Sequence, residues 1–462
     1  MFKSVTYIER RKLLKKDVGS GLILFLGNEE SPMNYPANTY HYRQDSSFLY
    51  FFGLDSPGLA AVIDVDAGKD VLFGDDIGIE DIIWMGNLPK MKERAFEVGV
   101  RHTAPRASFA ATVRQALAAG RPVHYLPPYR ADNALVLSDL LGIPVKELKS
   151  KASQGLIRAI VAQRIIKSKE EVREIESAVA ASQAMYLAAM KLAKPGRYEY
   201  EISGAMEGIA LSRGMHLAFP PIVTINGQTL HMHDHGNILV KGRLLVMDCG
   251  AESATSYASD ITRTVPVGGR FNRRQKDVYE IVLAGQETAI KALKPGINFK
   301  DIHLQTARVV AAGLKDLGLM KGGTGEAVAA GAHALFFPHG LGHNLGLDVH
   351  DMEDYGENNV GYGEKVERSS QFGLAYLRMA RELRPGHVMT IEPGLYFIPA
   401  LFALWRKEKK HRDFIVYDAV EKFLDFGGAR IEDDVLVTEK GRKVLGPPIP
   451  KTVVDVEKAC RS

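Results

Sequence analysis

Cysteine is nearly absent from this chain of 462 residues, which contains only Cys249 and Cys460. Two cysteines so far apart in the sequence exclude a disulfide framework and a zinc site built from cysteine pairs. Such low cysteine usage is typical of proteins from a reducing compartment, and we therefore expect a cytoplasmic protein.

The chain also lacks a strong charge imbalance and a long apolar run. Its 59 lysines and arginines against 55 aspartates and glutamates leave a net charge of +4, which does not indicate binding to nucleic acid or to an anionic membrane. The apolar stretch 21–27 is far too short to span a bilayer and predicts a buried strand, and the first residues lack the apolar core of a secretion signal. We expect a soluble, unsecreted protein without a membrane or nucleic-acid partner.

The length of the chain predicts two domains, because one hydrophobic core rarely grows to this size. The first part alternates strand-like and helix-like segments, which predicts an α/β domain. The expected strands are 21–26, 60–64, 69–73 and 122–126, and the expected helices are 90–98 and 107–119. A capping signal at Ser168 then begins a long amphipathic helix that extends to about residue 190. We place the boundary here, which gives domains 1–167 and 168–462.

The second domain contains a weak internal repeat of a Lys-Pro-Gly motif. Residues 194–196 and 294–296 each follow an amphipathic helix and lead into another, whereas Arg384-Pro385-Gly386 leads into a strand. Because Pro-Gly is common after helices, a chance match and a duplicated half-domain both remain open.

Two segments resemble insertions. Segment 354–382 is polar and glycine-rich at first and then helical, and segment 405–413 is a run of charge expected to form a solvated loop.

Two aspartates of the second domain are expected to lie side by side on a hairpin. An apolar strand, 244–248, ends in Asp248, and a β-branched strand begins at Asp260, twelve residues later. Pairing of these two strands could place the two carboxylates next to each other. Because burying an unpaired carboxylate is costly, a cation is expected beside them.

Three further residues of metal-binding type lie in strand-like or glycine-rich segments. His343 ends the sequence Pro-His-Gly-Leu-Gly-His at 338–343, where the glycines leave the imidazole room to point into a cleft. Glu392 ends a strand ahead of a Pro-Gly turn, and Glu432 lies within the strand-like segment 429–437. Two divalent cations would neutralise these four carboxylates, and the oxygen-rich set favours Mn²⁺ over Zn²⁺.

Each of these residues alone has an ordinary structural explanation, such as a turn cap or an ion pair. Together, in this order, they favour two cations that activate water for hydrolysis. A competing hypothesis starts from His231, His233 and His235, which would share one face of a strand and form the zinc site of an amidohydrolase or a cupin-like fold. That hypothesis leaves the five-residue set unexplained.

The five-residue set resembles the signature of the M24, or pita-bread, metallopeptidases, which include methionine aminopeptidases, prolidases and Xaa-Pro aminopeptidases. The resemblance covers roughly residues 170–445 and implies an α+β pita-bread catalytic domain. It implies that two cations are held by Asp248, Asp260, His343, Glu392 and Glu432. Asp260 and Glu432 would bridge the cations. Asp248 would bind one cation, and His343 and Glu392 would bind the other.

The resemblance also implies which residues act in catalysis, namely His231, His339, His350, Glu392 and Arg430. The histidines would contact the substrate or stabilise the tetrahedral intermediate through hydrogen bonds. Glu392 would carry a proton to the leaving proline nitrogen. Arg430 would orient the site or contact the peptide.

Residues 40–54 resemble the N-terminal domain of Xaa-Pro aminopeptidases and related prolidases, a domain that methionine aminopeptidases lack. The resemblance therefore implies an α/β domain of the creatinase/aminopeptidase P type ahead of the α+β pita-bread catalytic domain. It further implies an Xaa-Pro aminopeptidase that acts on peptides with proline at the second position. A homodimer or homotetramer is expected.

Two alternatives on the same fold are open. Prolidase, which cleaves Xaa-Pro dipeptides, uses the same chemistry and differs in whether the pocket closes on the carboxylate of proline. An inactive peptide-binding module is disfavoured because all five ligands and the three flanking histidines are retained.

The chain departs from the family pattern in its hairpin, where Asp248 and Asp260 are twelve rather than eleven residues apart and Ser256-Tyr257 replaces the usual Gly-Tyr. These departures concern the loop and not the metal site.

Overall fold

The computed structural model describes residues 1–363 and 365–461 and divides into two compact units. Unit 1 comprises Met1–Arg164 with Asp354–Asn359, and unit 2 comprises Ile165–Glu353 and Val360–Ser462. Packing therefore divides the chain between Arg164 and Ile165, and it assigns a short piece of the later sequence to unit 1. The boundary between residues 167 and 168 stays a prediction.

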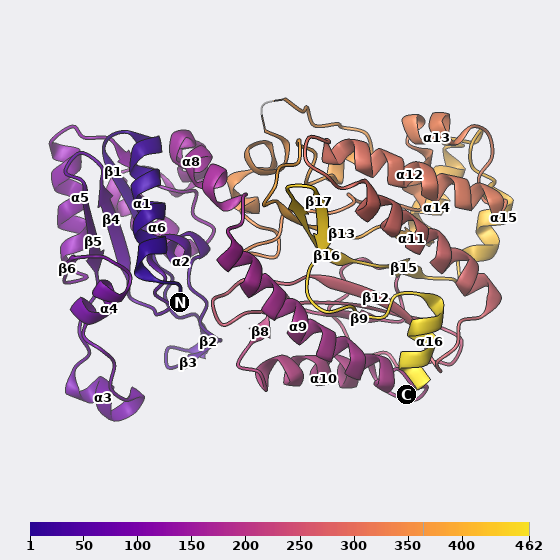
Figure 1. The fold of residues 1–462 in the computed structure, drawn as a ribbon, viewed down its shortest axis with the longest axis horizontal. Helices are drawn as coiled ribbons and strands as arrows, with labels where there is room; N and C mark the ends of the chain where they lie inside the picture. The colour runs from indigo at the N-terminus through magenta and orange to yellow at the C-terminus, as the bar shows by residue number, and fades with distance from the viewer. Residues whose placement is uncertain (364, 462) are drawn as a thin grey trace. The chain divides into compact units, whose positions relative to one another are not determined.

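Unit 1 is an α/β domain built on a five-stranded sheet (Figure 1). The sheet order is β6-β5-β4-β1-β7, in which β1–β7 and β5–β6 are parallel pairs and the other pairs are antiparallel. The strands of the unit are β1 (Leu22–Leu26), β2 (Pro32–Tyr35), β3 (Asn38–Thr39), β4 (Ala60–Asp64), β5 (Lys69–Phe73), β6 (His102–Ala104) and β7 (Val123–His124). The helices are α1 (Ser4–Val18), α2 (Ser46–Phe52), α3 (Ile79–Met85), α4 (Met91–Glu97), α5 (Ser108–Ala118), α6 (Ala131–Leu141), α7 (Val145–Lys151) and α8 (Gln154–Arg164).

The core of unit 1 forms where β1 meets α2. All five residues of β1 are buried, which matches its unbroken apolar sequence. The Phe25 ring packs against Phe51 and Phe52 of α2, at centroid distances of 5.1 and 5.7 Å. The predicted strands and helices of this unit are all present, although the strand expected over 122–126 is reduced to Val123–His124.

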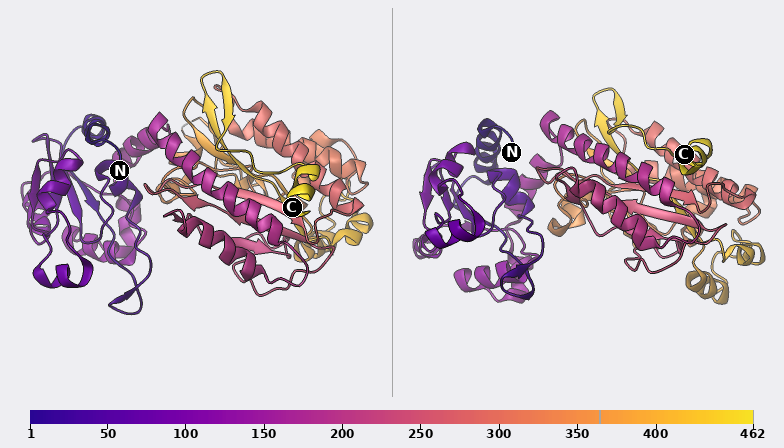
Figure 2. Two further views of the ribbon diagram at one scale, coloured as in Figure 1. Left: turned by 60° about the horizontal axis from the view of Figure 1, so that its bottom comes forward. Right: turned by 90° about the horizontal axis from the view of Figure 1, so that it is seen from below.

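Unit 2 combines two helix pairs with several short antiparallel sheets (Figures 1 and 2). Its helices are α9 (Lys169–Leu192), α10 (Glu199–Leu211), α11 (Arg273–Ala292), α12 (Phe299–Asp316), α13 (Thr324–Ala330), α14 (Pro399–Lys407), α15 (Tyr417–Val420) and α16 (Val453–Arg461). Its strands are β8 (His216–Leu217), β9 (Ile222–Thr224), β10 (Leu244–Cys249), β11 (Ala251–Glu252), β12 (Ile261–Pro266), β13 (Val388–Ile391), β14 (Gly394–Tyr396), β15 (Gly428–Arg430), β16 (Asp433–Thr438) and β17 (Gly441–Val444). The main sheets have the orders β12-β10-β9 and β13-β16-β17.

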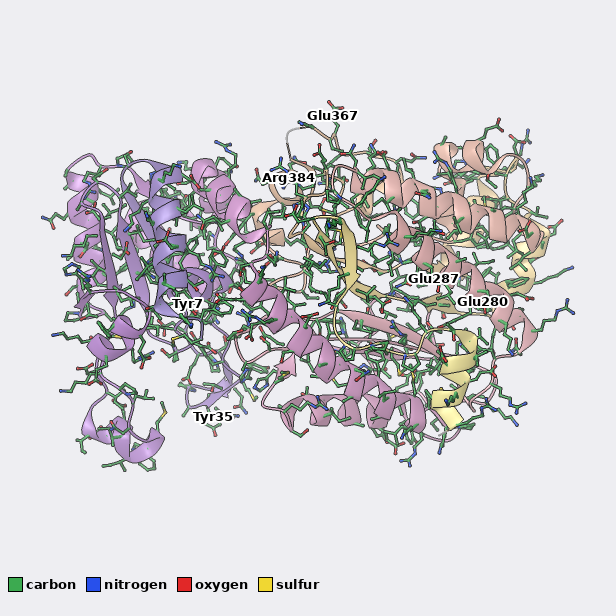
Figure 3. All side chains as sticks on the ribbon, in the orientation of Figure 1. Tyr7, Tyr35, Glu280, Glu287, Glu367 and Arg384 are labelled. Carbon is green, nitrogen blue, oxygen red and sulfur yellow. The ribbon has the colours of Figure 1, made fainter. Side chains whose placement is uncertain are left out.

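The long helices of unit 2 follow from their caps and apolar stripes. Helix α9 begins with the predicted capping box, in which the Ser168 hydroxyl accepts from the Glu171 N–H and the Glu171 carboxylate accepts from the Ser168 N–H. Helix α11 is amphipathic, with Tyr279 buried and with Glu280 and Glu287 on its exposed face (Figure 3). These helices can therefore be read from the sequence.

The two Lys-Pro-Gly motifs occupy equivalent places in unit 2. Gly196 and Gly296 both have left-handed φ angles, of 89° and 83°, and each connects a pair of packed helices. The Gly196 N–H donates to the Leu239 carbonyl, and the Gly296 N–H donates to the Leu383 carbonyl, both at 2.9 Å. Matching backbone contacts so far apart in the sequence favour a duplicated half-domain over a chance match.

The strands from the two halves of unit 2 meet at Thr262. Within β10–β12, Asp248 is paired with Thr262, so the predicted hairpin is present. Its loop accommodates Ser256 with a φ of 66°, a conformation for which glycine is the usual residue. The Glu432 N–H, ahead of β16, donates to the Thr262 carbonyl at 3.0 Å. This link joins the strand ends that carry the acidic residues.

Three sequence-based expectations for unit 2 are wrong in detail. In segment 354–382, whose residue 364 lies outside the described residues, the expected helix is replaced by a single π turn, Asn358–Tyr362, and a short 3₁₀ turn, Leu374–Tyr376. Segment 405–413 begins inside α14, and Trp405 is buried, so only its charged side chains behave as a solvated loop. Residues 231–235 form a turn and irregular backbone, so the strand required by the three-histidine zinc hypothesis does not exist.

Among the described residues, no helix combines the length and the apolar character that crossing a bilayer requires.

Candidate metal centre

Two aspartates line the centre from one hairpin. Asp248 is the penultimate residue of β10, and Asp260 immediately precedes β12. Both are at least nine-tenths buried. The Asp260 N–H donates to Asp434 Oδ2 at 3.0 Å, which fixes the backbone that carries the Asp260 carboxylate.

His343 is aimed at Asp260 by a tightly packed glycine loop. Its N–H donates to Thr390 Oγ1 at 3.1 Å, and its Nδ1 lies 3.1 Å from the Asn344 carbonyl. Nδ1–H therefore donates to that carbonyl, and Nε2 faces Asp260 Oδ2 at 3.3 Å. At Gly342 a Cβ atom would lie 2.0 Å from the Thr390 carbonyl oxygen, so only glycine allows this approach.

Two glutamates reach the same place from the second half of unit 2. Glu392 follows β13, and its Oε1 lies 3.9 Å from His343 Nε2. Glu432 lies between β15 and β16, and its Oε2 accepts a hydrogen bond from Thr262 Oγ1 at 2.7 Å. The two carboxylates thus converge on the hairpin that carries the two aspartates.

The donor set fits a cation. The ligand atoms of Asp260, His343 and Glu432 all lie within 4.8 Å of one another. Asp248 Oδ1 and Asp260 Oδ1 are buried without a hydrogen-bond partner among the described residues. Desolvation, followed by repulsion from the neighbouring carboxylates, raises the pKa of Asp260 and of Glu432 well above the ordinary range. Oxygen-rich sites with unsatisfied, crowded carboxylates are the environment that divalent cations occupy.

Arg430 supplies a positive charge at the edge of this set. Its guanidinium donates to Asp248 Oδ2 at 2.5 Å, to the Tyr396 hydroxyl at 2.7 Å and to Thr262 Oγ1 at 3.1 Å. Burial lowers the pKa of Arg430, but the surrounding anionic groups outweigh it and raise the pKa well above its ordinary value. Arg430 therefore stays charged and holds three side chains of the site in place.

A cavity of about 560 Å³ opens onto these residues. Its lining includes all of the sequence-predicted site residues: His231, Asp248, Asp260, His339, His343, His350, Glu392, Arg430 and Glu432. The structure thus brings the nine residues to one place, while their individual roles stay predictions. The third residue of the rejected three-histidine hypothesis, His235, is absent from the lining and hydrogen-bonds the Pro221 carbonyl at 3.1 Å.

Burial favours the neutral form of the three additional histidines. Desolvation lowers the pKa of His339 to about 3 and that of His350 to about 2, and it also lowers the pKa of His231. His339 has both nitrogens engaged, because Nδ1–H donates to the Gly340 carbonyl at 2.8 Å and Nε2 accepts from the Tyr396 hydroxyl at 2.9 Å. The His350 ring lies 4.0 Å from the His343 ring, centroid to centroid.

Sequence reasoning missed several residues at or beside the cavity. Phe372, Tyr376 and Arg378 come from segment 354–382, whose role could not be read from its composition, and Tyr396 lies behind the cavity beside Arg430. The only sequence signal for Arg378 is a cation within an otherwise apolar stretch, 377–380, of which its neighbours Leu377 and Met379 are buried. The insertion therefore forms a wall of the cavity.

The comparisons with known proteins agree with this geometry. The model of metallopeptidase family M24 matches residues 173–439, and that of the aminopeptidase P N-terminal domain matches residues 7–124. The chain is 33% identical to the Xaa-Pro dipeptidase of Homo sapiens over 96% of this chain and 89% of that one. It is also 33% identical to a protein of Aspergillus clavatus described as a probable Xaa-Pro aminopeptidase, over 90% and 88% of the two chains.

Solved structures match the whole chain as well. Aminopeptidase PepP of Pseudomonas aeruginosa superposes with a TM-score of 0.82 at 29% identity, covering 100% of this chain and 98% of that one. A zinc-substituted aminopeptidase P of Escherichia coli in complex with product gives a TM-score of 0.82 at 27% identity, with coverage of 100% and 99%. The expected α/β N-terminal fold followed by an α+β catalytic fold is confirmed.

Removal of divalent cations should lower the thermal stability of the protein. Because burial raises the pKa of Asp260, Glu392 and Glu432, the contribution of these three groups to the stability of the metal-free form is fully present below about pH 4, near their unfolded-state pKa values, and is lost as the pH rises through their folded-state pKa values. Adding Mn²⁺ to chelator-treated protein at pH 7.5 should raise Tm by several degrees, since a ligand at 100 Kd stabilises by about 2.7 kcal/mol. Scanning calorimetry measures this shift, and Asp260→Asn should abolish most of it. An unchanged Tm in both proteins would contradict a cation site here.

Proposed function

The chain belongs to metallopeptidase family M24, and on this premise we propose that it is an Xaa-Pro aminopeptidase, which cleaves the bond between an N-terminal residue and a following proline. The convergence of Asp260, His343 and Glu432 beneath one large cavity supports this proposal most directly. Similarity to Xaa-Pro aminopeptidases and dipeptidases along nearly the whole chain supports the substrate class. The proposed partners are peptides with proline at the second position, without nucleic acid or membrane, and the cytoplasmic location stays a prediction.

We propose that two cations, Mn²⁺ by preference, are held by Asp248, Asp260, His343, Glu392 and Glu432. Such a pair would lower the pKa of water and polarise the scissile carbonyl. Four carboxylates with a single imidazole suit a hard cation, which supports manganese over zinc. Elemental analysis of the purified protein that found zinc in place of manganese would contradict the choice of metal.

The proposed reaction is attack of water on the carbonyl that precedes proline. The oxygen of water bonds to the carbonyl carbon, and the bond from that carbon to the proline nitrogen breaks. Glu392, whose pKa is raised by burial, takes a proton from the water and delivers it to the proline nitrogen. His231, in the cavity lining, donates a hydrogen bond to the developing oxyanion, and His350, also in the lining, accepts one from an N–H of the substrate. His339 and Arg430 hold Tyr396 and Asp248 in position.

Glu392→Gln should reduce kcat on an Xaa-Pro-Yaa tripeptide by at least about a hundredfold, because the amide cannot carry the proton. The matched control is Glu287→Gln, which makes the same change on the exposed face of α11 (Figure 3) and should leave kcat unchanged. Both variants are assayed in the presence of Mn²⁺, and the released N-terminal residue is quantified by chromatography. Near-normal turnover by Glu392→Gln would remove Glu392 from the proposed mechanism.

Prolidase activity is the second candidate, and Arg378 is the observation that favours it. Arg378 lines the cavity as a cation that could receive the carboxylate of a dipeptide. Burial lowers the pKa of Arg378, yet an arginine remains protonated at neutral pH. A tripeptide would place a peptide carbonyl, rather than a carboxylate, beside this group.

The two candidates differ in the response to Arg378→Met. If the chain is a dipeptidase, this change should raise KM for an Xaa-Pro dipeptide by about tenfold or more, since a charged hydrogen bond is worth about 1.5–3 kcal/mol. For an Xaa-Pro-Yaa tripeptide the change should be several-fold smaller. Steady-state kinetics with both peptides distinguishes the cases. Equal effects on both, with faster turnover of the tripeptide, would leave the aminopeptidase as the function.

We propose that identical chains assemble into a dimer or tetramer, and the surface of α3 supports this. Ile79, Ile83, Trp84 and Met85 are each at least 70% exposed, and none of the residues of α3 is buried. An apolar patch of this kind on a soluble protein is typical of an interface. Trp84→Ser should lower the mass measured by light scattering after size exclusion. A wild-type protein that runs as a monomer would contradict the proposal.

A further inference from the structure

One carboxylate outside the cavity lining engages two groups that are within it. Glu353 Oε2 lies 2.5 Å from His350 Nδ1, and Glu353 Oε1 forms an ion pair with Arg378 Nη1. The two partners come from opposite ends of the long connection between His343 and β13. Each oxygen of Glu353 thus has its own partner, and both partners face the cavity.

The turn that presents Glu353 is anchored on both sides. The Glu353 N–H donates to the His350 carbonyl at 3.2 Å, which closes a tight turn over residues 350–353. Within it, Asp351 forms a buried ion pair with Lys167 at 2.8 Å, with both side chains 1% exposed. Met352 is buried with a φ of 63°, a backbone conformation that residues other than glycine rarely adopt. The turn is therefore held so that Glu353 returns to its neighbour His350.

The contact with Glu353 decides which nitrogen of His350 faces the substrate. A carboxylate accepts hydrogen bonds but cannot donate them, so Nδ1 of His350 carries the ring proton and its N–H donates a hydrogen bond to Glu353. Nε2 is then the nitrogen left for the cavity, on a ring packed against His343. A histidine whose second nitrogen is held by a carboxylate has a fixed ring orientation.

The same carboxylate holds the guanidinium of Arg378. An arginine has five N–H donors and a long flexible stem, and a partner that takes one donor restricts where the other donors can lie. The negative charge of Glu353 also offsets the positive charge of Arg378, which lines the same cavity as the proposed cation ligands. One residue therefore sets the position of an imidazole and of a guanidinium together.

We propose that Glu353 is a positioning residue that couples His350 to Arg378, so that the imidazole that accepts a hydrogen bond from the substrate and the guanidinium at the far end of the substrate are held as one unit. This inference rests on the proposed function and adds a residue to it. It assigns Glu353 an effect on both kcat, through His350, and KM, through Arg378.

The test uses Glu353→Leu in the full-length protein, with Glu382→Leu as the matched control on an exposed glutamate of the same connection. Both are assayed with Mn²⁺ on whichever of an Xaa-Pro dipeptide and an Xaa-Pro-Yaa tripeptide the wild type cleaves faster. Glu353→Leu should lower kcat about tenfold or more and raise KM several-fold, the range typical for loss of a group that orients a site residue. Glu382→Leu should match the wild type.

A double variant separates positioning from a general loss of structure. In an Arg378→Met background, Glu353→Leu should still lower kcat but should no longer change KM, because the group through which it affects KM is gone. An unchanged kcat and KM in Glu353→Leu, or an equal rise in KM in both backgrounds, would overturn the proposal. If Glu353→Leu does not fold, Glu353→Gln, which keeps one acceptor oxygen, should show a weaker form of the same split, and its absence would count equally against the proposal.

A second readout does not depend on turnover. Nitrogen NMR shifts of ring-labelled histidines, with His350→Gln identifying the signal, report which ring nitrogen of His350 carries the proton. The wild type should show the Nδ1–H form, and Glu353→Leu should show a mixture. A wild type that cleaves neither peptide but shows this change would refute the proposed function and leave the coupling standing, whereas an identical tautomer in both proteins would overturn the coupling itself.

Discussion

Repulsion among buried carboxylates is the constraint on which the structure of unit 2 depends. Asp248, Asp260, Glu392 and Glu432 are brought to one place, where desolvation and repulsion from neighbouring carboxylates oppose the ionisation of Asp260, Glu392 and Glu432. Removing an ion from water into a protein costs several kcal/mol unless opposite charge accompanies it. Arg430 supplies one such charge, directly to Asp248. The remaining negative charge makes the site suited to divalent cations.

The backbone around these residues resists that repulsion from both sides. Thr262 pairs with Asp248 across the hairpin, accepts the Glu432 N–H at its carbonyl and donates its hydroxyl to the Glu432 carboxylate. Asp434 holds the backbone N–H of Asp260, and Thr390 holds that of His343. Each half of unit 2 supplies two of the four carboxylates, so the centre exists only where the halves meet. A duplicated half-domain would lack the complete set by itself.

The sequence reveals those parts of the structure that have a period or a fixed motif. The β10–β12 hairpin, the cap at Ser168 and the glycine loop before His343 were all predictable, because alternation, capping chemistry and close approach each leave a local signature. The wall formed by Phe372, Tyr376 and Arg378 was not predictable, because its 3₁₀ turn and irregular backbone leave no repeating pattern in the sequence. The turn that carries Glu353 is set by the Lys167–Asp351 pair, a contact between residues far apart in sequence. Hence the acidic residues and histidines that meet at the cavity could be named in advance, whereas the other groups that shape the cavity could not.

The assignment of residues 354–359 to unit 1 has a consequence for any attempt to separate the two units. Tyr355 hydrogen-bonds Ser47 at 2.6 Å, so this strip of chain completes a domain that is otherwise encoded before residue 165. A truncated protein beginning at Ile165 would leave the strip without its packing surface, immediately after Glu353. Disorder in this strip would extend along the backbone through Glu353 to His350. An isolated catalytic fragment would therefore have a disturbed site, even with every proposed cation ligand present.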